Sequence, residues 1–162
     1  MCICTAFGGV IMNRICTFAG HGKIDYGEKT YKKMISCIKQ LICEDKIYNF
    51  WVGNYGNFDK LVAKAVSSLK TEYPEIKLCL VVPYITYAMS GSQAYYKDTF
   101  DEILIPEFPP HKSIRSYIPL CNQYMVDNAR VLICYVENDS GGAAQTYSYA
   151  LKNKIKIINL AD

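Results

Sequence analysis

The chain has 162 residues, of which 51% are hydrophobic and 20% are charged, and its formal net charge at pH 7 is +3. This length and composition predict one domain with a substantial core and exclude a disordered protein. The small net charge gives no electrostatic argument for a nucleic-acid-binding protein, because such proteins concentrate excess basic residues.

Hydrophobic periodicity divides most of the chain into alternating strands and helices. In chain order, we expect a strand at 14–19, a helix at 28–44, a strand at 47–52, a helix at 58–72, strands at 76–82 and 101–105, a helix at 113–128, a strand at 130–136, a helix at 142–153 and a strand at 155–160. Pro119 is expected to interrupt or kink the helix at 113–128. The polar and aromatic stretch after Pro83 is assigned no element.

These elements predict an α/β fold, a three-layer Rossmann-like sandwich with a mostly parallel central sheet. The strand at 76–82 is uniformly apolar, which is typical of a strand covered on both faces. No linker or long repeat divides the chain, so residues 1–162 are expected to form a single domain. Residues 1–13 are apolar but too short to span a bilayer and unlike a signal peptide. Either an extra edge strand or a poorly defined extension from a mis-set start codon explains them.

The eight cysteines indicate reduced thiols in a cytoplasmic protein. No Cys-x-x-Cys pair occurs, and neither His21 nor His111 has a cysteine at metal-ligand spacing, so no metal site is expected. The chain also contains no Gly-x-x-x-x-Gly-Lys-Ser/Thr and no Gly-x-Gly-x-x-Gly motif. We therefore expect neither an NTP-hydrolysing phosphate loop nor a bound cofactor.

Three glycine-bearing loops follow predicted strands, namely "GHGK", "GNYGNFD" and "NDSGGA". In open α/β sheets, ligands bind outside the carboxyl ends of the strands, so these loops predict one site. In the third loop, Gly141, Gly142 and Ala143 open a helix whose free N–H groups could hold a phosphate, with hydrogen bonds added by Gln145 and Thr146. An ordinary strand–helix turn explains the glycine pair equally well.

Other residues near these loops are candidates for binding a sugar or a base. Asp59 is expected either to accept a hydrogen bond from a ribose hydroxyl or to stabilise the start of its helix. His21 could stack on a base or bind phosphate, and Tyr55 and Tyr84, each just past a strand, could stack on a base. The remaining candidate ligand-binding residues are Gly20, Lys23, Gly53, Asn54, Asn122 and Met125.

Five stretches together resemble the SLOG superfamily, the Rossmann-like domains related to the DNA-processing protein Smf/DprA and the cytokinin-activating LOG proteins. They are "ICTFAGHGK", "WVGNYGNFDKLVAKAV", "LKTEYPEIKLCLVVPY", "CNQYMVDNARVLICYV" and "GGAAQTYSYALKNKIKIINL". Within the superfamily, they are most similar to the small branch called DUF1273 or YpsA-like. The resemblance implies a doubly wound sheet and a nucleotide-type ligand. Members include N-glycoside hydrolases of nucleoside monophosphates and sensors of NAD-derived signals in antiphage systems.

Two departures from the family pattern bear on function. The branch motif Thr-Gly-His-Arg is here Ala19-Gly20-His21-Gly22, so a phosphate-binding arginine is absent and Lys23 could replace it. The hydrolytic members carry Pro-Gly-Gly-x-Gly-Thr-x-x-Glu, and Ser148 stands here in the place of the glutamate. Because glycosidic cleavage needs a carboxylate near the scissile bond, this second departure counts against an enzyme.

The first hypothesis is therefore non-catalytic binding, by which the protein senses or sequesters a nucleotide such as an ADP-ribose-type signal. The phosphate would lie at 141–146, the ribose near Asp59 and Asn54, and the base near His21 or Tyr84. The first alternative is an N-glycoside hydrolase of a nucleoside 5′-monophosphate, with Asp59 or Asp127 as the carboxylate. A weaker alternative is a DNA-processing accessory protein. A homodimer or higher homo-oligomer is expected, with no membrane partner and no nucleic acid.

Overall fold

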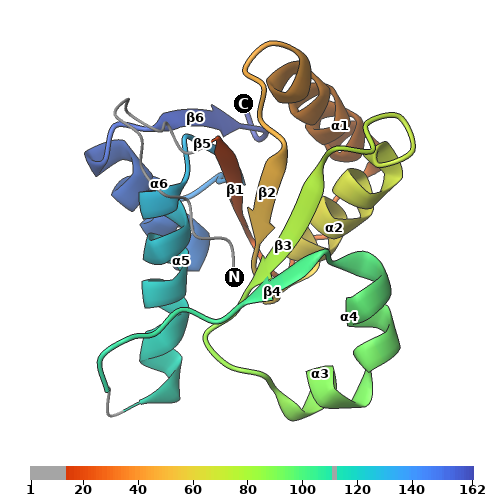
Figure 1. The fold of residues 1–162 in the computed structure, drawn as a ribbon. Coiled ribbons are helices and arrows are strands. Elements are labelled where there is room, and N and C mark those ends of the chain that lie inside the picture. Colours follow the sequence, from red (N-terminus) through yellow and green to blue (C-terminus); the bar gives the residue numbers. More distant parts are fainter. Residues whose placement is uncertain (1–13, 111–112) are drawn as a thin grey trace, which may run out of the picture.

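The computed structural model describes residues 14–110 and 113–162 (Figure 1). Its strands are β1 (Ile15–Gly20), β2 (Asn49–Val52), β3 (Lys77–Val81), β4 (Glu102–Leu104), β5 (Val131–Tyr135) and β6 (Lys156–Asn159). Its helices are α1 (Glu28–Cys43), α2 (Asn57–Leu69), α3 (Tyr87–Gly91), α4 (Gln93–Thr99), α5 (Tyr117–Asn128) and α6 (Gly142–Lys152), with a 3-10 turn η1 (Ile114–Ser116). The expectation for residues 1–13 lies outside the described part of the chain.

The six strands form one sheet in the order β4-β3-β2-β1-β5-β6, and every neighbouring pair is parallel. Helices α1 and α2 cover one face of the sheet, and α5 and α6 lie on the other (Figure 1). The predicted α/β fold, a three-layer Rossmann-like sandwich, is confirmed, and the sheet is wholly parallel among the described strands.

Both faces of the central strands are buried, which explains their continuous apolar sequences. In β3, Leu78 and Leu80 pack in the core beneath α1 and α2, whereas Cys79 and Val81 pack on the opposite face near α5. Strand β5 alternates in the same way, with Ile133 on the α1–α2 side and Leu132 on the α6 side. The parallel direction of all six strands brings the loops that follow them to one edge of the sheet.

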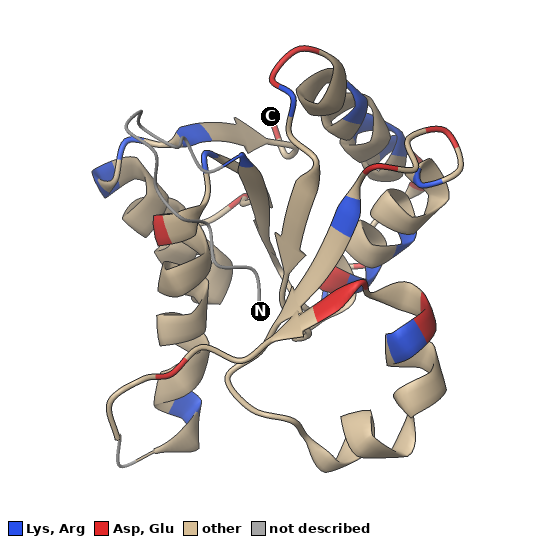
Figure 2. Cartoon of the chain, viewed as in Figure 1, with Lys and Arg blue, Asp and Glu red and all other residues tan. Residues whose placement is uncertain are grey.

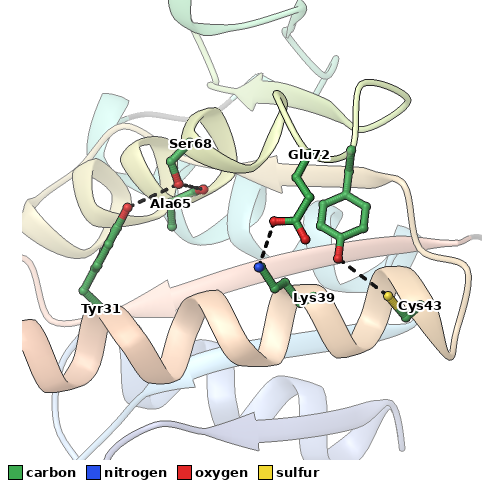
Figure 3. A network of polar contacts seen from close by, with 7 residues as sticks. Tyr31, Lys39, Cys43, Ala65, Ser68 and Glu72 are labelled. Carbon is green, nitrogen blue, oxygen red and sulfur yellow. Dashed lines mark hydrogen bonds and ion pairs between the residues drawn. The ribbon is translucent and has the colours of Figure 1, made fainter.

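Polar side chains join α1 to α2 and to the loop after α2, outside the apolar core (Figure 3). The Tyr31 hydroxyl lies 3.3 Å from Ser68 Oγ, and Lys39 forms a 2.8 Å ion pair with Glu72. These groups are solvent-exposed, so each contact contributes little to stability. They add polar contacts between two helices whose apolar faces already share the core.

The stretch after Pro83 is more ordered than its sequence suggested, because it forms α3 and α4. Thr86 caps α3 by accepting a hydrogen bond from the Met89 N–H at 3.2 Å. The expected kink at Pro119 is wrong, because α5 begins at Tyr117. Pro119 therefore lies in the first turn, where a helix needs no N–H donor.

The six cysteines of the described chain are all free, namely Cys16, Cys37, Cys43, Cys79, Cys121 and Cys134. Burial raises the pKa of the Cys121 and Cys134 thiols to about 12, which leaves both as inert thiols. Within residues 14–110 and 113–162, none of the helices has the length and apolar character that crossing a membrane requires.

Candidate functional site

The sheet order reverses between β1 and β5, which are neighbours with five residue pairs in register from Cys16–Val131 to Gly20–Tyr135. The chain leaves β1 toward α1 on one face and leaves β5 toward α6 on the other face (Figure 1). Such a switch point opens a crevice outside the carboxyl ends of the two strands, because the following loops diverge.

A cavity of about 530 Å³ lies at this switch point. Four segments enclose it: the loop after β1, the loop from β2 into α2, one face of α5, and the loop from β5 into α6. It brings together most of the predicted site residues, namely Gly20, His21, Lys23, Gly53, Asp59, Asn122, Met125, Gly141, Gly142, Ala143 and Thr146. Residues from opposite ends of the sequence thus line one cavity.

Three predicted residues do not line the cavity. The Asn54 amide donates a 3.0 Å hydrogen bond to the Tyr96 hydroxyl, and Tyr84 is half-buried beyond the end of β3. Gln145 is exposed on α6, because the helical turn that directs Gly142 and Thr146 to the cavity directs position 145 outward.

The first turn of α6 faces the cavity without a side-chain cap. Gly141 occupies the cap position with φ +90°, a conformation that L side chains rarely adopt, and no side chain bonds to the helix start. The N–H groups of the first turn have no partner within a helix, so they are open to an anion. The Thr146 hydroxyl donates to the Gly142 carbonyl at 2.9 Å, so it presents an acceptor rather than a donor to the cavity.

The N-terminus of α2 is closed, although it borders the same cavity. The Asn57 N–H donates to the Gly22 carbonyl at 2.9 Å, and the Asn57 side-chain amide donates to the Ile24 carbonyl at 3.2 Å. A Cβ on Gly56 would overlap the backbone of Gly22, so the two loops touch through bare glycines. The loop after β1 therefore occupies the position that an anion would need at α2.

Asp59 is the acidic side chain among the residues that line the cavity. Its Oδ2 accepts a 2.8 Å hydrogen bond from the Tyr55 N–H, while burial raises the pKa of the carboxyl to about 6. Gly53 leaves room for the Asp59 carboxyl, because a Cβ at position 53 would lie only 3.3 Å from Asp59 Oδ2. The group therefore changes charge near neutral pH and can accept a hydrogen bond or hold a proton.

His21 is held in place through its main chain. The Tyr26 hydroxyl donates to the His21 carbonyl at 2.7 Å, and the Tyr26 ring packs edge-on against Phe58 and Tyr135 at centroid distances of 5.2 and 5.0 Å. The imidazole Nε2 lies 3.5 Å from the Glu137 N–H, beside the loop that follows β5. Lys23 on the same loop is exposed and forms no ion pair within the described chain.

The structure does not bring Asp127 or Ser148 to the cavity. Asp127 lies on a different face of α5 from Ile118, Asn122 and Met125, where it is exposed and accepts a 2.7 Å hydrogen bond from the Tyr149 hydroxyl. Ser148 is exposed on the face of α6 that points away from the cavity. Within one chain, a glutamate at position 148 would therefore not reach a ligand in this cavity.

Sequence reasoning did not single out several lining residues. Gly22, Gly56, Phe58 and Asn138 stand in the three predicted loops, whereas Phe18, Ala19, Ile24 and Ile118 lie outside them. Asn138 carried a usable signal, because it precedes the glycine pair in the same loop, and its Oδ1 accepts hydrogen bonds from the Ser140 N–H and hydroxyl at 3.3 and 3.1 Å. Ile118 carried none, because an isoleucine on a helix is usually a core residue. Tyr55, considered above as a stacking group, does line the cavity.

Comparison with known proteins reveals likeness in structure only, since no family model and no curated protein sequence matches the chain. The X-ray structure of DNA processing protein A (DprA) from Streptococcus pneumoniae superposes with a TM-score of 0.59, covering 90% of this chain and 50% of that one at 14% identity. The chain has the fold of the matching half of DprA.

A DprA from Helicobacter pylori, described for its single-stranded DNA binding mode, gives a TM-score of 0.58 at 11% identity over 90% of this chain and 64% of that one. The chain thus spans half to under two thirds of the length of these proteins. The likeness agrees with the Smf/DprA resemblance at the level of the fold, and assignment to the DUF1273 or YpsA-like branch stays a prediction.

Proposed function

We propose that the protein binds a nucleotide that carries one phosphate, in the cavity at the switch point and without chemical conversion. The observation that carries this proposal is the uncapped first turn of α6, which opens into a cavity of about 530 Å³. This volume lies within the range of small-molecule sites, and an uncapped helix start provides N–H donors for an anion.

The phosphate contacts the N–H groups of Gly142 and Ala143, with the Lys23 ammonium as counter-charge from the opposite loop. Both small residues leave the space above the helix start open, since a Cβ on Gly142 would meet nothing within 4 Å. Lys23 replaces the arginine of the family motif in this arrangement, as a flexible point charge rather than a planar fork.

The cavity offers few groups that could neutralise the charge of a second phosphate. The other bordering helix start, that of α2, is already occupied by the Gly22 carbonyl. Asp59 adds a negative charge on that side at neutral pH, since its pKa is about 6. A monophosphate is therefore favoured over a diphosphate such as ADP-ribose, because like charges in a poorly solvated site repel strongly.

The sugar and base extend from the phosphate toward α5. A ribose hydroxyl donates to the Asp59 carboxylate, and the base lies against Ile118 and Met125 with Tyr55 at the rim. Asn122 projects from the same helix, and its side-chain amide forms no hydrogen bond within the described chain, so it is available to a base edge. Tyr84, which does not line the cavity, has no part in this arrangement.

A thermal-shift and calorimetry panel tests this proposal. It compares nucleoside 5′-monophosphates, ribose 5-phosphate, inorganic phosphate, ADP-ribose, cyclic ADP-ribose isomers and NAD, each at about 1 mM, the concentration at which millimolar affinity becomes visible. The expected result is a rise in melting temperature with monophosphates that exceeds the rise with phosphate alone. A larger rise with ADP-ribose compounds would show a sensor or a sequestering protein for NAD-derived signals instead. No rise with any compound would end the proposal.

An N-glycoside hydrolase of nucleoside monophosphates is the second candidate function, and Asp59 favours it. A carboxyl with a pKa of about 6 inside a cavity is suited to proton transfer at neutral pH. Release of free base, followed by chromatography, is the measurement, with Asp59→Asn as the inactive control. Binding without any release of base supports the non-catalytic function.

Single-stranded DNA is a third candidate, because of the fold shared with DprA. The placement of the basic side chains argues against DNA binding at the cavity. Lysines and arginines lie mainly over α1 and at the edge of the sheet where the strands begin, as with Arg14, Lys77 and Lys156 (Figure 2). This edge is opposite the cavity. A gel shift with an oligonucleotide that weakens steeply with salt would favour DNA, and competition by a monophosphate would place it at the cavity.

A further inference from the structure

Asp59 is an acid that shares a cavity with an anion site and has no ion-pair partner of its own. Its side chain lines the cavity, and none of the ion pairs within the described chain includes it. Oδ2 accepts the 2.8 Å hydrogen bond from the Tyr55 N–H, which leaves Oδ1 without a donor among the described residues. The bare first turn of α6 opens into the same space and favours an anion there. A carboxylate at position 59 therefore repels the ligand that the helix attracts.

The other titratable groups around the cavity do not cancel this repulsion. Lys23, on the loop after β1, supplies one positive charge, whereas a phosphate monoester carries about −1.5 to −2 at pH 7. His21 Nε2 accepts from the Glu137 N–H at 3.5 Å, so that atom carries no proton. Burial raises the pKa of the Tyr55 and Tyr26 hydroxyls, so both stay neutral. Helix α5 and the loop from β5 into α6 contribute only uncharged residues to the wall.

We propose that the protein takes up a proton from solvent on Asp59 when it binds an anion at the first turn of α6. This inference rests on the proposed function, because it concerns the same cavity. Burial already raises the pKa of the Asp59 carboxyl to about 6, so the group is mostly charged at pH 7 while the cavity holds no ligand. The charge of the ligand raises that pKa further, because a nearby like charge disfavours the ionised form. Anion binding is therefore tighter at low pH than at high pH.

The protonated carboxyl keeps every contact that the charged form makes. The proton binds Oδ1 of Asp59, because Oδ2 is engaged by the Tyr55 N–H. Oδ1–H then becomes a hydrogen-bond donor, while Oδ2 continues to accept. A ribose hydroxyl both donates and accepts, so it pairs with either form of the carboxyl. The proton thus removes the repulsion between Asp59 and the ligand without removing the contact proposed for the sugar.

Carbon-13 NMR of the Asp59 carboxyl in the full chain tests the proposal. The carboxyl signal is followed from about pH 4 to pH 8 with and without sulfate, a probe whose own charge is constant over this range. Sodium chloride at equal ionic strength is the control for general screening. Sulfate is expected to shift the amide signals of Gly142 and Ala143 and to raise the pKa of Asp59 by about 1. By linkage, sulfate then binds about tenfold more tightly at pH 5 than at pH 8.

Asp59→Asn is the matched variant, because its amide keeps an oxygen for the Tyr55 N–H and carries no charge. It should bind sulfate more tightly than the wild type at pH 8 and lose most of the dependence on pH. Sulfate that shifts the Gly142 amide signal without raising the pKa of Asp59 overturns this inference and leaves the proposed function standing. So does an equal rise in chloride, or wild-type pH dependence in Asp59→Asn. An amide signal of Gly142 that responds neither to sulfate nor to nucleoside monophosphates overturns both.

Discussion

Phe58 packs against the backbone of Gly20 at the end of β1, in the space that a side chain at position 20 would fill. A Cβ added to Gly20 would overlap the Cβ and ring of Phe58, which is itself buried at the start of α2. Gly20 was predicted as a ligand-binding residue, and it lines the cavity, but its lack of a side chain is required by this contact. The glycine therefore sets how closely α2 approaches β1 beneath the cavity.

Gly20→Ala is expected to destabilise the protein. The added methyl group must displace Phe58, and such overpacking costs about 1–3 kcal/mol. Urea denaturation measures the free energy of unfolding. Gly91→Ala is the matched control, because a Cβ there meets nothing within 4 Å. An equal effect of the two substitutions would contradict the packing role of Gly20.

The two glycines at the start of α6 are expected to respond differently to substitution. Gly142→Val should leave the melting temperature close to that of the wild type, since position 142 is open, and should abolish monophosphate binding by filling the anion space. Gly141→Ala should lower stability by about 1–2 kcal/mol, because position 141 has φ +90°. Calorimetric affinity and thermal melting of both variants provide the measurement. Unchanged affinity in Gly142→Val would show that the glycine pair serves only as a turn.

Asp59 is expected to make the protein less stable as the pH rises through about 6. Its folded-state pKa is raised by burial to about 6, above the value of about 3.9 in an unfolded chain. Stability from the protonated form is thus fully present below about pH 4 and is lost on passing about pH 6. Asp59→Asn keeps an oxygen for the Tyr55 N–H and should be more stable than the wild type at pH 8, by about 2 kcal/mol after allowance for solvent in the cavity.

Urea denaturation of both proteins at intervals from pH 4 to pH 8 measures this difference. The wild-type and Asp59→Asn curves should converge at pH 4, where Asp59 is protonated in the folded protein. A difference that is constant across the whole range would show that the carboxyl is not shifted. The comparison cancels the titration of all other groups, which the two proteins share.

Thiol reactivity should follow burial along the described chain. Cys43 is exposed near the Tyr73 hydroxyl, whereas Cys121 and Cys134 are buried with pKa values of about 12. Brief alkylation of the native protein at pH 8, followed by peptide mass spectrometry, should label Cys43 and leave the other two unlabelled. Labelling of Cys121 before unfolding would show that α5 does not pack on β3 as described.

Apolar periodicity predicted the parallel sheet because its strands are buried on both faces, as Leu78 and Cys79 illustrate. It missed α3 and α4, because helices this short present less than two full turns of pattern. The glycine loops predicted the cavity, since the carboxyl ends of parallel strands share one edge. The sequence pattern did not predict where individual side chains point. The Asn54 amide forms a hydrogen bond with Tyr96, 42 residues away in sequence, and Asp127 forms one with Tyr149 outside the cavity.

The bare first turn of α6 has a consequence for the local stability of the protein. A helix that begins at a glycine cap, as α6 does at Gly141, forgoes roughly a few tenths of a kcal/mol of local stability relative to a Ser, Thr, Asp or Asn cap. Local opening of the protein without an anion is therefore expected to begin at Gly142, the first residue of α6. A bound anion closes this turn and slows amide hydrogen exchange there. Amide hydrogen exchange in the first turn of α6, compared with and without the anion, measures this difference.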